Sequence, residues 1–138
     1  MLSLIYGGIT HHYLSKDLPY CNKIGGVGTI HNEYIIAMAG DKDFKLGVLS
    51  GKDSACGSIF GPISAIGLSD NIDLMVGGYN TNFKKFHDRG IEPPSIRGIT
   101  PVVGLDFKIP IYESGNTKFS IDTLVSVDVI THAINFTF

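Results

Sequence analysis

The chain has 138 residues, which is enough for one core, so we treat residues 1–138 as a single domain. Its formal net charge of −2 gives no electrostatic basis for binding nucleic acid. Charged residues make up 17% of the sequence, below the roughly one quarter usual for soluble domains. No segment approaches the ~18 apolar residues of a membrane-spanning helix. MLSLIYGGITHHY lacks the features of a secretory signal, which predicts a cytosolic product or a mature form with a new Met.

Alternation of apolar and polar residues with a period of two dominates the chain, and no helical pattern persists. The first predicted strand covers residues 2–13 and the second covers 24–39. The HNE segment at 31–33 could instead be a turn, which would split the second strand and give nine strands. We take eight, because closed antiparallel barrels of one chain favour even counts. The other predicted strands cover 44–50, 58–68, 72–77, 99–111, 119–125 and 130–138.

Eight strands separate the long connections from the tight turns. The loops that would share one rim are 14–23, 51–57, 81–98 and 126–129. Turns such as GDKD (40–43) and ESGN (113–116) would share the other rim. Because outer-membrane barrels have this arrangement, we predict an all-β, eight-stranded antiparallel up-and-down β-barrel of the outer-membrane type.

The alternation alone does not tell which face of the strands points outward, because a soluble barrel would use the same pattern inverted. One face carries Asp73, Asp106, Lys108 and Asp122, which suits a small polar lumen. The last strand, ITHAINFTF, resembles the aromatic C-terminal signal that barrel-assembly machinery reads in outer-membrane proteins. We therefore expect the apolar face to meet lipid and the protein to lie in the outer membrane. A soluble cytoplasmic barrel with its apolar face inward is the alternative.

The two cysteines, Cys21 and Cys56, have no CxxC spacing, so a metal site is not expected. They are either free thiols or a disulfide, and a disulfide requires an oxidising compartment. The eight-strand count puts both on the rim of long loops, where they could pair. Nine strands would put them at opposite ends of the barrel.

Residues with the chemistry of acyl transfer fall on that same rim. His11 and His12 end the first strand on opposite faces, and Asp53 and Ser54 lie in the loop SGKDSACGS. Histidines near loops are usually surface residues, and an Asp-Ser pair in a loop usually stabilises a turn. Brought together, however, an imidazole can take the proton of a hydroxyl while a carboxylate orients the imidazole.

Several short motifs resemble the outer-membrane lipid A palmitoyltransferases. That family has an ITWH segment, a GGGFG strand and an AMAFKDS stretch, and this chain has, in the same order, ITHHY (9–13), GGVG (25–28), AMA (37–39) and KDS (52–54). The segment IEPPSIRGITP (91–101) is similar to the proline-rich loop of the family between strands five and six.

The resemblance implies specific site residues. His12 takes the place of the essential histidine, and Asp53 and Ser54 take the places of the Asp-Ser pair. Because AMA and KDS are contiguous in the family but separated here, Asp41 or Asp43 is an alternative to Asp53.

The resemblance also implies that the lumen holds one phospholipid acyl chain, which the rim residues transfer to lipid A without a cofactor or metal. The partners would be phospholipid and lipid A in the membrane, and the protein would be a monomer. Met75, Tyr79 and Leu124 point inward and could simply fill the lumen. The basic loop FKKFHDRG (83–90) is either solvated or contacts anionic headgroups. The rival functions are a non-enzymatic outer-membrane barrel and a soluble, phage-encoded barrel that binds a lipid or small ligand.

Overall fold

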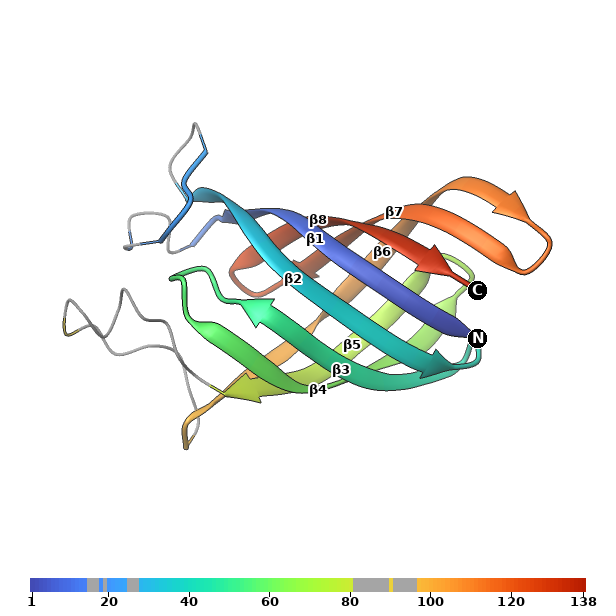
Figure 1. The fold of residues 1–138 in the computed structure, drawn as a ribbon, viewed down its shortest axis with the longest axis horizontal. Helices are drawn as coiled ribbons and strands as arrows, with labels where there is room; N and C mark the ends of the chain where they lie inside the picture. Colours follow the sequence, from blue (N-terminus) through green and yellow to red (C-terminus); the bar gives the residue numbers. More distant parts are fainter. Residues whose placement is uncertain (15–17, 19, 25–27, 81–89, 91–96) are drawn as a thin grey trace.

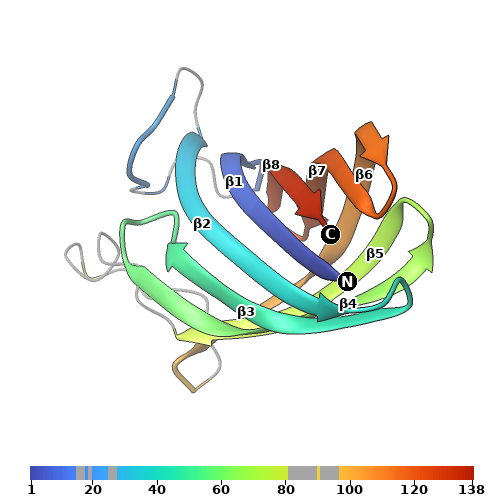
Figure 2. The same ribbon diagram turned by 45° about the vertical axis from the view of Figure 1, so that its right-hand side comes forward.

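Eight antiparallel strands close into one barrel in the computed structural model of this chain (Figures 1 and 2). The structure describes residues 1–14, 18, 20–24, 28–80, 90 and 97–138. The strands are β1 (Leu2–His12), β2 (Thr29–Gly40), β3 (Phe44–Lys52), β4 (Ser58–Ser69), β5 (Ile72–Asn80), β6 (Ile99–Ser114), β7 (Thr117–Ser126) and β8 (Val129–Thr137). Each strand pairs with its neighbour in the sequence, and β8 pairs with β1 to close the wall. The predicted eight-stranded antiparallel up-and-down barrel is confirmed.

Among the described residues, the structure contains no helix that is both long enough and apolar enough to cross a membrane.

The second strand begins later than its sequence pattern predicted. The HNE segment lies inside β2, where His31 is opposite Ile9 of β1, so the nine-strand alternative is wrong. The strand starts at Thr29 because Gly28 has a φ of 76°, a left-handed conformation outside the extended region. The predicted start at residue 24 was therefore too early.

Apolar side chains point outward and charged side chains point inward along the same strands. Phe107, Ile121 and Phe136 are 38%, 39% and 40% exposed. Asp106 and Asp122, each next to one of these residues in sequence, are 1% and 0% exposed. Successive side chains of a strand alternate between its two faces, so these pairs fix the orientation of the wall. The face assignment made from the sequence is confirmed.

The two ends of the barrel differ. We call the end with the connections around Ser54 and Asp128 the loop rim, and the end with Met1 and Phe138 the terminal end; Figure 1 shows the two termini side by side there. Leu2 and Phe138 exchange backbone hydrogen bonds of 3.0 and 2.8 Å, so the termini themselves complete the wall.

The lumen at the terminal end is filled by a buried polar network, which we call the polar floor. Lys45 and Lys108 both contact the carboxylate of Asp73, with Lys45 Nζ at 3.4 Å. Asn135 Nδ2 donates to Asp122 Oδ2 at 2.8 Å. Charges are tolerated in such a buried position because each is paired or hydrogen-bonded. The members of the polar floor are Ser3, Lys45, Asp73, Asp106, Lys108, Ser120, Asp122 and Asn135.

An aliphatic layer lies between the polar floor and the loop rim. Its buried side chains come from strands all around the barrel: Ile5, Tyr34, Ile36, Met38, Leu49, Ile59, Ile63, Ala65, Met75 and Ala133. Tyr79 and Leu124 pack against them, as their predicted inward orientation requires. The lumen therefore changes from charged to apolar along the barrel axis.

The polar floor predicts a stability effect for Asn135, which accepts from Ser3 Oγ at 3.0 Å and donates to Asp122. Asn135→Leu keeps the volume but leaves both partners buried without this hydrogen bond. We expect the free energy of unfolding to fall by about 2–3 kcal/mol. Denaturant unfolding of the purified protein measures it. The outward neighbour supplies a control, Ile134→Leu, which should change stability little; equal losses in the two variants would contradict the role of the network.

Candidate active site

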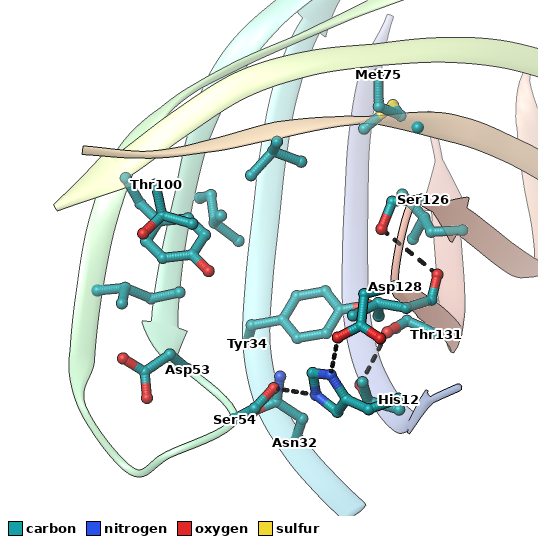
Figure 3. Close-up of a pocket in the computed structure, with 18 of the residues that line it drawn as sticks. His12, Asn32, Tyr34, Asp53, Ser54, Met75, Thr100, Ser126, Asp128 and Thr131 are labelled. Carbon is teal, nitrogen blue, oxygen red and sulfur yellow. Dashed lines mark hydrogen bonds and ion pairs between the residues drawn. The ribbon is translucent and has the colours of Figure 1, made fainter. Parts of the chain in front are cut away.

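His12 lies at the loop rim with its imidazole between a hydroxyl and a carboxylate. It is the last residue of β1, on the inner face, and is 5% exposed. Its Nε2 is 2.8 Å from Ser54 Oγ, and its Nδ1 is 3.0 Å from Asp128 Oδ2. Figure 3 shows the His12 ring joined by one dashed line to Ser54 and by another to Asp128. The three side chains come from β1, from the β3–β4 connection and from the β7–β8 connection.

The partners of His12 determine which ring nitrogen carries the proton. An ionised Asp128 can only accept a hydrogen bond, so Nδ1 carries the proton and donates it. Nε2 is then the acceptor for the hydroxyl of Ser54. This is the donor and acceptor order of a Ser-His-Asp triad, in which the imidazole takes the serine proton and the carboxylate holds the ring.

Burial lowers the pKa of His12 from its ordinary value of 6.5. The hydrogen bond and the negative charge of Asp128 oppose this shift, and the neighbouring His11 adds a small lowering. His12 lies nearer the loop rim than Ile9, which is the last apolar residue on the outer face of β1. The imidazole is therefore neutral at pH 7, which is the form that can accept a proton.

Tyr20 and the disulfide hold the segment around residue 20 against His12 and the Ser54 loop. The Tyr20 ring stacks on His12 with centroids 3.9 Å apart and planes 14° from parallel. The next residue, Cys21, forms a disulfide with Cys56, and its N–H donates to the carbonyl of Ser54 at 2.9 Å. Both cysteines lie on one rim, as the eight-strand count predicted, and of the two alternatives the disulfide is the one that the structure shows. The disulfide thus joins the segment that packs on the base to the loop that carries the hydroxyl.

Asp53 lies in the predicted loop on this rim, but its carboxylate hydrogen-bonds the backbone of its own loop. Its Oδ1 accepts hydrogen bonds from the N–H groups of Ala55 and Gly57 at 2.9 and 2.8 Å. These bonds shape the loop on which Ser54 sits, which is the turn role that an Asp often has in loops. Asp128, and not Asp53, is the carboxylate that contacts His12.

The alternatives Asp41 and Asp43 lie at the terminal end, away from His12. Asp41 Oδ1 accepts from the N–H groups of Asp43 and Phe44 in the tight turn between β2 and β3. The adjoining Gly40 N–H donates to the carbonyl of Met1. Neither aspartate can take the place of Asp53.

Asp128 was missed by the sequence analysis, although its loop was correctly assigned to this rim. Its Oδ1 accepts from the N–H of Leu14 at 2.8 Å, and its carbonyl accepts from the N–H of Tyr13 at 3.0 Å. These bonds extend the β1–β8 pairing by one step beyond His12. One signal in the sequence could have indicated Asp128. It is an acidic residue in the short loop before β8, and β8 pairs with β1, the strand that ends in His12.

A cavity of about 800 Å³ runs from these residues into the lumen. His12, Ser54 and Asp128 lie at its mouth, and the fully buried Met75 lies at its inner limit. None of the residues of the polar floor lines it. Its wall is mainly aliphatic, with Ile36, Leu49, Ile59, Ile63, Val102 and Leu124. Side chains therefore do not fill the half of the lumen nearer the loop rim, and an elongated apolar group fits the space below the hydroxyl.

The cavity also opens sideways through the wall. The pairing of β6 with β7 begins where Gly104 is opposite Ser126. Among the described residues, 99–103 of β6 pair only with β5. Pro101 and Val127, both exposed on the outside of the molecule, also line the cavity at this gap. A ligand can therefore reach the site between β6 and β7 as well as through the loop rim.

Three segments named above lie mostly outside the described residues. Only Gly28 of GGVG, Gly90 of FKKFHDRG and residues 97–101 of IEPPSIRGITP are described.

The electrostatics of the site predict the effect of Asp128→Asn on the base. In the wild type, the negative charge of Asp128 and its hydrogen bond both raise the pKa of His12. The variant removes the charge and weakens the hydrogen bond. We therefore expect the pKa of His12 to fall further below 6.5. NMR titration of the histidines measures the shift. Asp53→Asn is the matched control, because its amide oxygen can still accept from Ala55 and Gly57; a larger shift in the control would contradict the geometry.

Three comparisons with known proteins give no relative for this chain. No protein-family model, no curated protein and no solved structure matches it.

Proposed function

We propose that this protein is an outer-membrane acyltransferase that moves one acyl chain from a glycerophospholipid to the lipid A part of lipopolysaccharide. One observation carries the proposal. The contacts of Ser54 with His12 and of His12 with Asp128 lie at the mouth of an apolar cavity of about 800 Å³. A polarised hydroxyl at the entrance of an aliphatic tunnel is suited to an ester whose acyl chain lies in the tunnel.

The cavity supports a long apolar substrate. Its volume lies within the ~300–1,000 Å³ of small-molecule sites. Each methylene that leaves water for such a wall contributes about 0.8 kcal/mol. Because the tunnel runs inward from Ser54 to Met75, the chain can enter with its carbonyl carbon left beside the hydroxyl.

The triad supports a two-step transfer. Ser54 Oγ attacks the ester carbon of the phospholipid while His12 Nε2 takes the hydroxyl proton. The carbonyl electron pair moves to oxygen and returns as the bond to the glycerol oxygen breaks. That oxygen takes the proton from His12 and leaves as a lysophospholipid. A hydroxyl of lipid A then attacks acyl-Ser54, gives its proton to His12, and the restored Ser54 hydroxyl recovers that proton.

The outer surface supports a membrane location. Apolar side chains on the outside of the strands are 38–62% exposed, among them Tyr6, Ile35, Leu46, Phe60, Val103, Phe107, Ile121 and Phe136. Exposed charged residues of the strands lie toward the two ends of the wall: Glu33 and Lys52 toward the loop rim, and Glu113 and Lys118 toward the terminal end. An apolar band between polar ends is the surface of an outer-membrane barrel.

The gap between β6 and β7 offers a phospholipid a route from the membrane. A chain that enters beside Pro101 and Val127 reaches the cavity without passing through water. The choice of lipid A as acceptor rests on the resemblance of ITHHY and KDS to the lipid A palmitoyltransferases.

Mass spectrometry of lipid A from bacteria that express the protein tests the proposal. The wild type should add one acyl chain. His12→Ala and Ser54→Ala should abolish the addition, and Asp128→Asn should lower it by roughly 10²–10⁴-fold.

His11→Ala supplies the matched control, because this histidine points outward on the same strand. It should retain wild-type acylation. Unchanged acylation in His12→Ala would remove the proposal. Lysophospholipid that accumulates without any change in lipid A would show that the acceptor is a different molecule.

The inner limit of the cavity predicts which chain lengths are transferred. Met75→Ala deepens the tunnel, so the transferred chains should become longer; Ile63→Phe narrows it, so they should become shorter. The chain-length profile of the modified lipid A measures both. Leu74→Ala changes the outward neighbour of Met75 and should leave the profile as it is. An unchanged profile in Met75→Ala and Ile63→Phe would place the acyl chain outside this cavity.

A further inference from the structure

The proposed acyl transfer creates a negative charge on the carbonyl oxygen of the substrate, and the Ser54 loop has few free N–H groups to hydrogen-bond it. When Ser54 attacks an ester, the carbonyl oxygen becomes an oxyanion, and hydrogen bonds to it supply a large part of the catalysis. Serine enzymes often use the N–H of the residue after the nucleophile. Here that residue is Ala55, whose N–H already donates to Asp53 Oδ1 at 2.9 Å. Gly57 N–H donates to the same oxygen, and Cys56 N–H donates to the Asp53 carbonyl at 3.2 Å.

A side-chain amide lies next to this position. Asn32 is on β2 and lines the same cavity as Ser54. Tyr34 pairs with Gly51 of β3, so Asn32, two residues nearer the rim, is level with Asp53 and beside Ser54. Figure 3 shows Asn32 close to Ser54 at the mouth of the cavity.

The regular alternation of β2 places Asn32 on the inner face. Gly7 is opposite Tyr34 and Ile9 is opposite His31, so Asn32 and Glu33 together face the single residue Gly8 in a β-bulge. The alternation of β2 continues through this bulge: Ile30 and Tyr34 are buried, and His31 and Glu33 are exposed. Asn32 therefore lies on the same face as Ile30 and Tyr34, where it lines the cavity.

The amide of Asn32 is also available. Within the part of the chain that the structure describes, its side chain makes no hydrogen bond and is partly open to the cavity. An Asn side chain carries two N–H donors. An unused donor at the mouth of a largely apolar cavity, beside a serine whose following amides are occupied, has the position that an oxyanion would need.

We propose that Asn32 is a catalytic residue whose side-chain N–H donates to the oxyanion formed on attack by Ser54; this inference rests on the proposed acyl transfer. As the bond between Oγ and the carbonyl carbon forms, the π electrons move to oxygen and His12 takes the hydroxyl proton. Asn32 transfers no proton. Its hydrogen bond strengthens as charge develops and weakens when the leaving oxygen departs and the carbonyl is restored.

Hydrolysis of p-nitrophenyl palmitate by the purified, detergent-solubilised protein tests the inference. Asn32→Ala and Asn32→Asp should lower kcat by about 10²–10³-fold, the loss found when one oxyanion donor is removed. KM should stay unchanged, because the bond forms only in the transition state. The pH profile of kcat/KM should also stay unchanged, because His12 sets it. Heat-modifiable migration on a gel verifies that each variant is folded.

Asn80→Asp is the matched control. Asn80 lies at the end of β5 near the same rim and hydrogen-bonds Phe60 N–H and the Ser58 carbonyl, outside the cavity. The variant adds the same charge at the rim and should leave kcat at its wild-type value.

The possible results separate this inference from the proposed function. If the wild type shows no hydrolysis, or if its hydrolysis does not depend on His12, the proposed function and the inference are both overturned. An active wild type together with Asn32 variants of near-normal kcat would overturn the inference alone. A higher KM at unchanged kcat would also overturn it, because Asn32 would then bind the ground state.

A loss of kcat in Tyr34→Phe without a loss in Asn32→Ala would overturn the inference as well. It would assign the donor to the Tyr34 hydroxyl, which has no hydrogen-bond partner among the described residues.

Discussion

The pairing of β1 with β8 is the interaction on which both the lumen and the candidate site depend. It joins the two ends of the chain, from the bonds between Leu2 and Phe138 to the Asp128 carbonyl that accepts from Tyr13. At the terminal end this pairing encloses the polar floor, and at the loop rim it brings Asp128 to His12 across a sequence separation of 116 residues. Without closure, His12 would have no carboxylate partner and the cavity would have no complete wall. Strand pairing in this fold therefore supplies the alignment of side chains that the proposed catalysis requires.

The two halves of the lumen differ in polarity. The charges around Asp73 are held in a buried place by their mutual contacts, and breaking such a network leaves an uncompensated charge. Met75 lines the cavity, whereas Ile5, Met38, Ala65 and Ala133 of the aliphatic layer do not, so these side chains separate the cavity from the charges. An acyl chain bound as proposed would contact apolar atoms along its length and Met75 at its end. The same barrel holds a polar support at one end and an apolar binding space at the other.

The sequence predicted the wall of the barrel better than the details of the site. Alternation with a period of two located the strands, and the even strand count of closed barrels decided for eight and so brought His12 and Ser54 to one rim. The inward orientation of Asp106 and Asp122 was inferred from their charge, because alternation by itself does not tell the two faces apart. It could not decide between two carboxylates on that rim, because the role of Asp53 depends on backbone N–H groups of its own loop. Nor could it reveal the bulge at Asn32, which exists only in the register between β1 and β2. Such features depend on pairing between distant segments, and local patterns do not record them.

The disulfide between Cys21 and Cys56 joins the segment that stacks on His12 to the loop that carries Ser54. The same two segments also share the hydrogen bond from Cys21 N–H to the Ser54 carbonyl, and the disulfide adds a covalent tether to this contact. A newly made chain in a reducing compartment would lack that tether. If Ser54 attacks an ester as proposed, the attack would then be most efficient after the chain reaches an oxidising space, and lipids met earlier would be spared.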